Sequence, residues 1–166
     1  MTQTEILAFR RRCRQFRWLA MFMVISVGLL MALMAWIAPI LIALVKGRPL
    51  QWGSMAAMTV WNLPVACYLF AVWTIGSTLG ELAKGRLIQA ALPPALRRVG
   101  IALGLGGLTS VFVVSNLMRL IGQAKGGYLH FDVAAMTLGM IGGALFLLGR
   151  VMDQALAAQA ELDEMI

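Results

Sequence analysis

The sequence predicts an all-α fold, a polytopic membrane protein with four transmembrane helices and helical extensions in the cytoplasm at both ends. Of its 166 residues, 61% are hydrophobic and 13% are charged, whereas about a quarter of the residues of a soluble domain are charged. Four stretches carry no charge, namely residues 18–45, 49–80, 99–118 and 133–149. One crossing needs about 17–25 apolar residues, so each stretch supports one crossing and none supports two.

The lysines and arginines predict the orientation of these helices. If the N-terminus is inside, ten of them lie on the inner side and four on the outer side. Loops rich in lysine and arginine stay in the cytoplasm, so we expect both termini there. The net charge of +7 is then mainly an orientation signal with some attraction to anionic lipid, and no direct binding of nucleic acid is expected.

The chain divides into the parts of a single four-helix domain. We expect spans at about residues 18–45, 54–82, 99–121 and 133–149. The connection between the first two spans is short, so they should be antiparallel neighbours. Between the second and third spans lies a basic cytoplasmic loop, residues 83–98, which we expect to break at Pro93 and Pro94. Residues 150–166 contain no glycine or proline and should continue the last span as a helical tail.

Both ends of the chain have an apolar seam at helical spacing. The seams comprise Ile6, Phe9, Cys13 and Phe16 at one end and Val151, Ala155, Ala158 and Leu162 at the other. Basic residues flank the first seam and acidic residues the second, which predicts that the two helices pair and present a docking surface beside the basic loop. The alternative is a basic helix that lies on lipid headgroups, with a frayed acidic tail. The candidate partner-binding residues are Arg10, Arg14, Arg17, Lys84, Arg86, Arg97, Arg98, Asp153, Glu161 and Glu164.

Small residues recur at steps of four in three of the spans. These are Gly76 and Gly80, Gly100 and Gly104, and Ala135, Gly139 and Gly143. Such spacing lets helix backbones approach closely in a membrane. We expect some of these stripes to pack the chain's own helices and one of them to support a homodimer.

Few residues suggest ligand chemistry. Asn62, Asn116 and Arg119 are candidates for a cavity that binds a lipid or another ligand, although Arg119 also fits a side chain that snorkels to the outer interface. The sequence has one histidine and two cysteines, and it shows no cluster typical of a metal or haem site. We therefore expect no catalytic, metal or cofactor-binding residues, and the chain is not expected to be an enzyme.

Two segments resemble a known family. The stretch LAKGRLIQAALPPALRRVG and the ending GGALFLLGRVMDQALAAQAELDEMI resemble the YoaS-like bacterial four-helix membrane proteins of unknown function. The matching positions are Lys84, Gly85, Leu87, Ile88, Leu96, Arg97, Arg98, Gly100, Gly149, Arg150, Val151, Ala155 and Glu161. The resemblance implies the bacterial inner membrane and a neighbouring Cro/C1-type helix-turn-helix regulator. Residues 59–74 are also similar to the tryptophan-rich sensory proteins that bind porphyrins, but those have five spans.

Two functions follow as expectations. The first is a regulatory or signalling membrane protein that holds a soluble cytoplasmic partner on its cytoplasmic face, with a helix-turn-helix transcription regulator as the candidate. The second is a small transporter or a protein that binds a lipid or another hydrophobic ligand. No Asp or Glu lies within the four uncharged stretches, so a proton-coupled transporter would lack its usual carrier.

Overall fold

The computed structural model describes residues 3–47, 49, 52–84, 88–122 and 131–164, with side chains for all of these except residues 3–10, 88–90 and 163–164. Every element in these ranges is helical, and four helices are long and apolar enough to cross a membrane: Arg11–Lys46, Trp52–Ala83, Ala91–Leu120 and Val133–Leu162. The predicted all-α fold with four such helices is therefore confirmed, and the chain has the make-up of a multi-pass membrane protein.

The first long helix is continuous from the N-terminal segment into the first span. It consists of α1 (Gln3–Ala32), a π-helical turn η1 (Leu33–Ile37) and α2 (Ala38–Lys46). The π turn lies just before Pro39, whose ring would clash with the carbonyl of Ala35 in a regular α-helix. The N–H of Ala38 instead bonds to the carbonyl oxygen of Leu33, five residues earlier. The widened turn thus accommodates the proline and keeps the helix unbroken.

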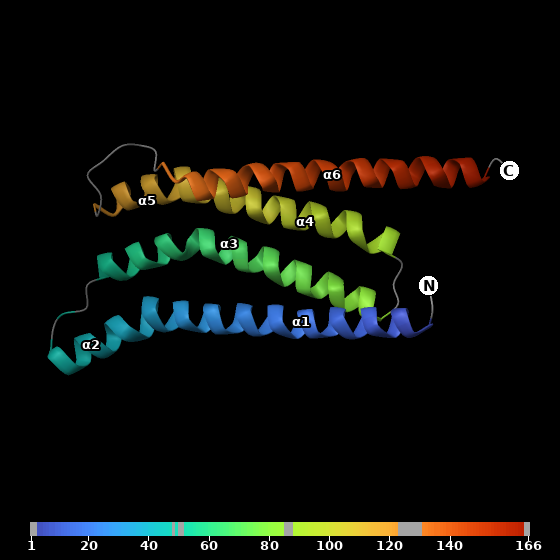
Figure 1. Ribbon diagram of the computed structural model, residues 1–166. Helices are drawn as coiled ribbons and strands as arrows, with labels where there is room; N and C mark the ends of the chain where they lie inside the picture. The colour runs from blue at the N-terminus through green and yellow to red at the C-terminus, as the bar shows by residue number, and fades with distance from the viewer. Residues whose placement is uncertain (1–2, 48, 50–51, 85–87, 123–130, 165–166) are drawn as a thin grey trace.

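The chain then turns back, and the helix α3 (Trp52–Ala83) packs beside α1, as the short connection predicts. Pro64 lies inside α3 and is buried, and the helix bends in its first half (Figure 1). Gly76 and Gly80, one of the three predicted small-residue stripes, are both buried against α1. A Cβ atom on Gly76 would lie 3.1 Å from the Cβ of Ala20, so this stripe joins the first two spans.

The segment around Pro93 and Pro94 differs from the predicted loop. The helix α4 (Ile88–Leu108) begins before both prolines and runs through them, and Pro93 is fully buried. The prediction of a break there was wrong. The two prolines free only the carbonyl groups of residues 89 and 90, in the first turn of α4, where a helix end is open to water. The free-energy cost of placing prolines inside a helix is therefore smaller here. The packing of Pro93 against α6 (Val133–Glu164) offsets the cost that remains.

After α4 the chain forms a second π turn and a short helix before the last span. These are η2 (Thr109–Val113) and α5 (Val114–Leu120), which continue the axis of α4. Asp132 begins α6, because its Oδ1 accepts hydrogen bonds from the backbone N–H groups of Ala134 and Ala135 at 3.0 and 3.3 Å. The helix α6 then continues to Glu164, so the predicted helical tail extends the last span without interruption.

The four long helices pack side by side in chain order (Figure 1). Extended contacts join α1 to α3, α3 to α4 and α4 to α6, whereas no extended contact between α1 and α6 occurs among the described residues. The start of α1 and the end of α6 lie at the same end of the bundle along the helix axes, on opposite edges of the row (Figure 1). The predicted pairing of the two terminal helices is therefore not found, because α3 and α4 stand between them.

The core consists mainly of small side chains, and the large apolar side chains point outward. Ala71, Val99 and Ala102 form the centre, and Leu103 and Leu145 pack around it. Trp18, Phe22, Leu44 and Met140 are largely exposed. A soluble monomer rarely exposes so much apolar surface, whereas hydrocarbon solvates it well. A helix bundle in a bilayer requires this arrangement, with small side chains inside and large apolar side chains facing the lipid.

Candidate functional site

Glycines fix the position of α6 against α4. A Cβ atom on Gly100 would lie 2.5 Å from the backbone nitrogen of Phe146, and one on Gly149 would lie 2.9 Å from the carbonyl oxygen of Pro93. Gly107 and Gly142 make equally close backbone approaches to the facing helix. Only glycine permits such spacing. The two helices therefore form one rigid pair that ends at the predicted cytoplasmic side.

The predicted stripes locate this contact only in part. Gly100 lies in it, as expected, and Ala135 is buried there. The Cβ positions of Gly104 and Gly143 meet nothing within 4 Å, and that of Gly139 is in ordinary contact with Gly107 at 3.7 Å. Gly142 and Gly149 were missed. Their signal is a spacing of seven, from Gly100 to Gly107 and from Gly142 to Gly149, which returns to the same side of a helix after two turns.

An ion pair stands at the predicted cytoplasmic end of this helix pair. Arg97 of α4 donates a hydrogen bond from Nη1 to Oδ2 of Asp153 on α6 at 3.1 Å. The guanidinium group of Arg97 also lies 5.9 Å from the centre of the Phe146 ring, a distance at which a cation is attracted to an aromatic face. Asp153 was predicted to face the arginines of the N-terminal helix, and its partner is instead on the adjacent helix α4.

Most of the other predicted partner-binding residues lie on the surface of this end. Arg14, Lys84, Arg98 and Glu161 are exposed, and so are Arg11, Arg12 and Arg150. None of these arginines forms an ion pair with another residue that the structure describes. Arg86 and the side chains of Arg10 and Glu164 lie outside the described residues. The described part of this surface is therefore rich in arginines that have no carboxylate partner within it.

Arg17 and Lys84 come together between α1 and α3. They line a pocket of about 220 Å³ with Met21, Trp73, Ser77, Gly80 and Glu81. Arg17 lies across Gly80, where a Cβ atom would be 2.8 Å from the Cδ of Arg17. The structure thus turns one arginine of the N-terminal helix into an interhelical position, whereas Arg11, Arg12 and Arg14 remain exposed.

The predicted ligand residues Asn62, Asn116 and Arg119 do not come together around a described pocket. The amide nitrogen of Asn116 donates to the carbonyl oxygen of Phe112, in its own helix, at 2.7 Å. Asn62 and Arg119 are half-buried, and Arg119 is engaged in an interaction of its own. None of the three lines the pockets described in this section.

A pocket with three polar side chains in its lining does occur nearby, between α3, the turn η2 and the start of α6. It has a volume of about 220 Å³, and Tyr68, Ser110 and Asp132 line it together with Trp61. The Tyr68 hydroxyl group is buried without a hydrogen-bond partner among the described residues, and the Tyr68 ring packs on Gly106. No sequence signal placed Tyr68 beside Asp132, because Tyr68 lies within α3 and Asp132 directly precedes α6. Oδ1 of Asp132 already accepts two backbone hydrogen bonds at the start of α6.

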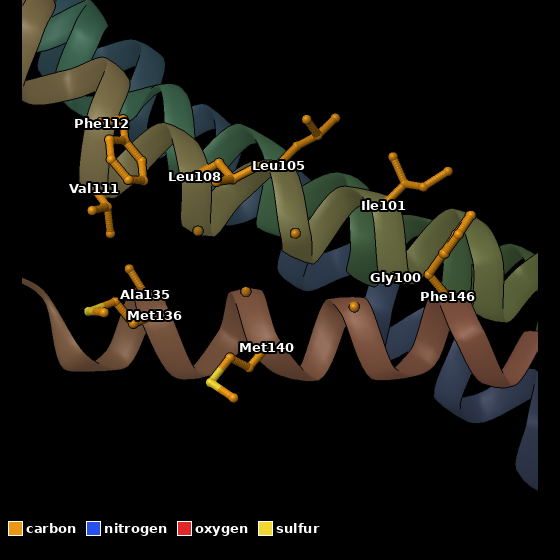
Figure 2. A pocket seen from close by; sticks show the side chains of 14 residues that line it. Gly100, Ile101, Leu105, Leu108, Val111, Phe112, Ala135, Met136, Met140 and Phe146 are labelled. Carbon is orange, nitrogen blue, oxygen red and sulfur yellow. The ribbon is translucent and has the colours of Figure 1, made fainter.

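The largest of these three pockets is an apolar groove of about 660 Å³ between α4 with η2 and α6. Figure 2 shows Val111 and Phe112 on one wall and Ala135 and Met136 on the other. Its lining is almost wholly apolar and includes Gly104 and Gly143, where an added Cβ atom would meet nothing within 4 Å. The groove has the chemistry of a site for hydrocarbon, and it offers no group for catalysis.

Nothing in the described residues assembles a metal site, since no three His, Cys, Asp or Glu side chains come together there. Comparisons with protein-family models, with curated proteins and with solved structures each found no match. The resemblance to the YoaS-like proteins stays a prediction.

Proposed function

We propose that this chain is a regulatory or signalling protein of the bacterial inner membrane that is not an enzyme and that holds a soluble partner on its cytoplasmic face. In this proposal both termini are cytoplasmic. The observation that supports the proposed partner binding is that the end of α6 extends beyond the start of α4 (Figure 1). With 32 residues, α6 is about 48 Å long, whereas the hydrocarbon core of a bilayer is about 30 Å thick. On the order of 18 Å is then available outside the membrane core.

The projecting part of α6 keeps its apolar seam uncovered. Val151 is 60% exposed and Leu162 is 57% exposed. In a helix of 3.6 residues per turn, the seam of Val151, Ala155, Ala158 and Leu162 lies opposite Asp153, whose side chain is bound to Arg97 of α4. The ion pair therefore turns this seam away from the bundle. An uncovered apolar seam fits the apolar face of an amphipathic partner.

The identity of the partner follows from the sequence resemblance alone, which points to a helix-turn-helix regulator encoded by a neighbouring gene. The test is to co-express that regulator with the full chain and to measure how much remains bound in mild detergent. We expect the double substitution Val151→Ser and Leu162→Ser to release it. The matched control, Ala157→Ser and Ala160→Ser, changes the other side of the same exposed segment and should retain it. Equal retention by both variants would contradict the proposal.

The alternative function is the binding of a lipid or another hydrophobic ligand, and the groove between α4 and α6 supports it. Gly104→Leu together with Gly143→Leu would fill the groove without entering the contact of the two helices, because both Cβ positions are free. Native mass spectrometry of the full chain in mild detergent should then show loss of a bound hydrophobic molecule. Unchanged occupancy would remove the groove from consideration.

A further inference from the structure

The pocket between α1 and α3 is built around a cation that is held in place. Arg17 crosses Gly80 so closely that a Cβ atom there would lie 3.1 Å from both its Nε and its Nη1. Any larger residue at this position would displace the side chain. Gly80 therefore keeps the guanidinium group between the two helices. An arginine that simply snorkelled to water would need no such contact.

The charge of this pocket is positive. Arg17 and Lys84 contribute two cations, and Glu81 contributes the one carboxylate among the described lining residues. Neither Arg17 nor Lys84 forms an ion pair with a described residue. The Ser77 hydroxyl group lies in the same lining and can also contact an anion. An arginine and a lysine in the lining of one pocket are typical of a phosphate site.

The remaining walls are apolar and lead toward the membrane interior. Met21 lies one turn beyond Arg17 on α1, and Trp73 lies one turn beyond Ser77 on α3. Trp73 is 46% exposed, and tryptophan prefers the boundary between headgroups and hydrocarbon. The pocket therefore combines a cationic end with an apolar wall, which matches the headgroup and upper acyl chain of a phospholipid.

We infer that this pocket binds the phosphate of an anionic phospholipid of the inner leaflet, with Arg17 and Lys84 as its ligands. Basic pockets between transmembrane helices on the cytoplasmic side hold anionic headgroups, and each nearby cation contributes about a fivefold gain in binding. A zwitterionic lipid fits less well because its positive group would meet Arg17 and Lys84. The site is independent of the seam on α6 and of the apolar groove.

The test uses Trp73 as the reporter in the full chain, with Trp18, Trp36, Trp52 and Trp61 replaced by Phe. Phosphatidylglycerol and phosphatidylcholine with brominated acyl chains are compared as quenchers of Trp73 fluorescence in mixed micelles. We expect phosphatidylglycerol to quench at a lower mole fraction. Arg17→Gln and Lys84→Gln should each weaken this preference about fivefold, whereas Arg17→Lys should retain most of it.

Two matched variants separate a built site from general surface charge. Arg12→Gln removes the same charge from an exposed position on the same helix and should leave the preference unchanged. Gly80→Ala keeps every charge but displaces Arg17, so it should weaken the preference while circular dichroism still shows a helical chain. Equal quenching by both lipids, or an equal loss in Arg12→Gln and Arg17→Gln, would overturn the inference. Displacement of the lipid by soluble glycerol phosphate would also overturn it, because the pocket would then be a site for free phosphate esters.

Discussion

Gly142 of α6 meets the backbone of Gly104 of α4, where a Cβ atom on Gly142 would lie 2.5 Å from the Gly104 nitrogen. The relationship is not reciprocal. A Cβ atom on Gly104 meets nothing within 4 Å, because it points into the groove between the helices. Two glycines that face each other therefore have different roles, one in helix contact and one in the wall of the groove.

This difference predicts opposite effects of the same substitution. Gly142→Ala should destabilise the chain by about 1–3 kcal/mol, because the added methyl group pushes α4 and α6 apart. Gly104→Ala should be neutral or slightly stabilising, since the methyl group finds open space and alanine favours the helix. Thermal unfolding in one detergent, followed by circular dichroism, measures both.

The adjacent residue Gly143 provides a second control for this contact. Gly143→Ala should behave like Gly104→Ala, because its Cβ position is also free. A destabilisation by Gly143→Ala as large as that by Gly142→Ala would show that α6 is rotated from the orientation described. If Gly143→Ala instead changed the size of the oligomer, Gly143 would belong to a contact between chains.

The ion pair between Arg97 and Asp153 gives a second prediction. Both side chains remain about half exposed, so their direct coupling should contribute no more than about 1 kcal/mol. A double-mutant cycle of Arg97→Gln and Asp153→Asn measures it from thermal unfolding. Arg97→Ala should cost more than Arg97→Gln, because the stem of Arg97 also packs on Gly149. A coupling energy well above 1 kcal/mol would mean that the pair is shielded from water.

The sequence predicts the number of long helices well, because a charge inside hydrocarbon is costly and the uncharged runs are therefore clear. It also predicts the contact of Gly76 and Gly80 with a neighbouring helix, since the loop before α3 leaves α1 as the nearest helix. It does not show which of the two glycines, Gly142 or Gly143, makes the close contact with α4. One residue rotates a helix face by about 100°, and both glycines fit a spacing that permits close packing.

The prolines and the ion pair could not be predicted for a different reason. Local preference places a break at Pro93, but burial of Pro93 against α6 outweighs it. Arg97 and Asp153 are 56 residues apart, and they meet only because the glycine contacts set the register of α4 against α6. Opposite charge at the two termini suggested another partner for Asp153, since charge alone carries no information about which helices are neighbours.

The predicted topology, with both termini inside, gives a third prediction. Cys13 is buried, so its failure to react with a thiol reagent would say nothing about sidedness. Both native cysteines are therefore replaced by alanine. Pro49→Cys and Gln159→Cys then place single thiols at exposed positions near opposite ends of the bundle. An impermeant maleimide should label Pro49→Cys in intact cells and Gln159→Cys only after permeabilisation. The reverse pattern would invert the orientation.

The separation of the outer helices gives the last prediction. Because α3 and α4 lie between α1 and α6, the double variant Phe16→Cys with Val151→Cys should form no crosslink within one chain, although both positions belong to the apolar seams. The matched pair Ala20→Cys with Gly76→Cys joins neighbouring helices whose Cβ positions are 3.1 Å apart. A shift of a few tenths of an ångström brings them to disulfide distance, so this pair should crosslink under mild oxidation. Gel mobility with and without reductant separates crosslinks within a chain from those between chains. An intrachain Phe16–Val151 crosslink would show that the row closes on itself, whereas an interchain crosslink would show that the outer edges of two copies meet and would support the predicted homodimer.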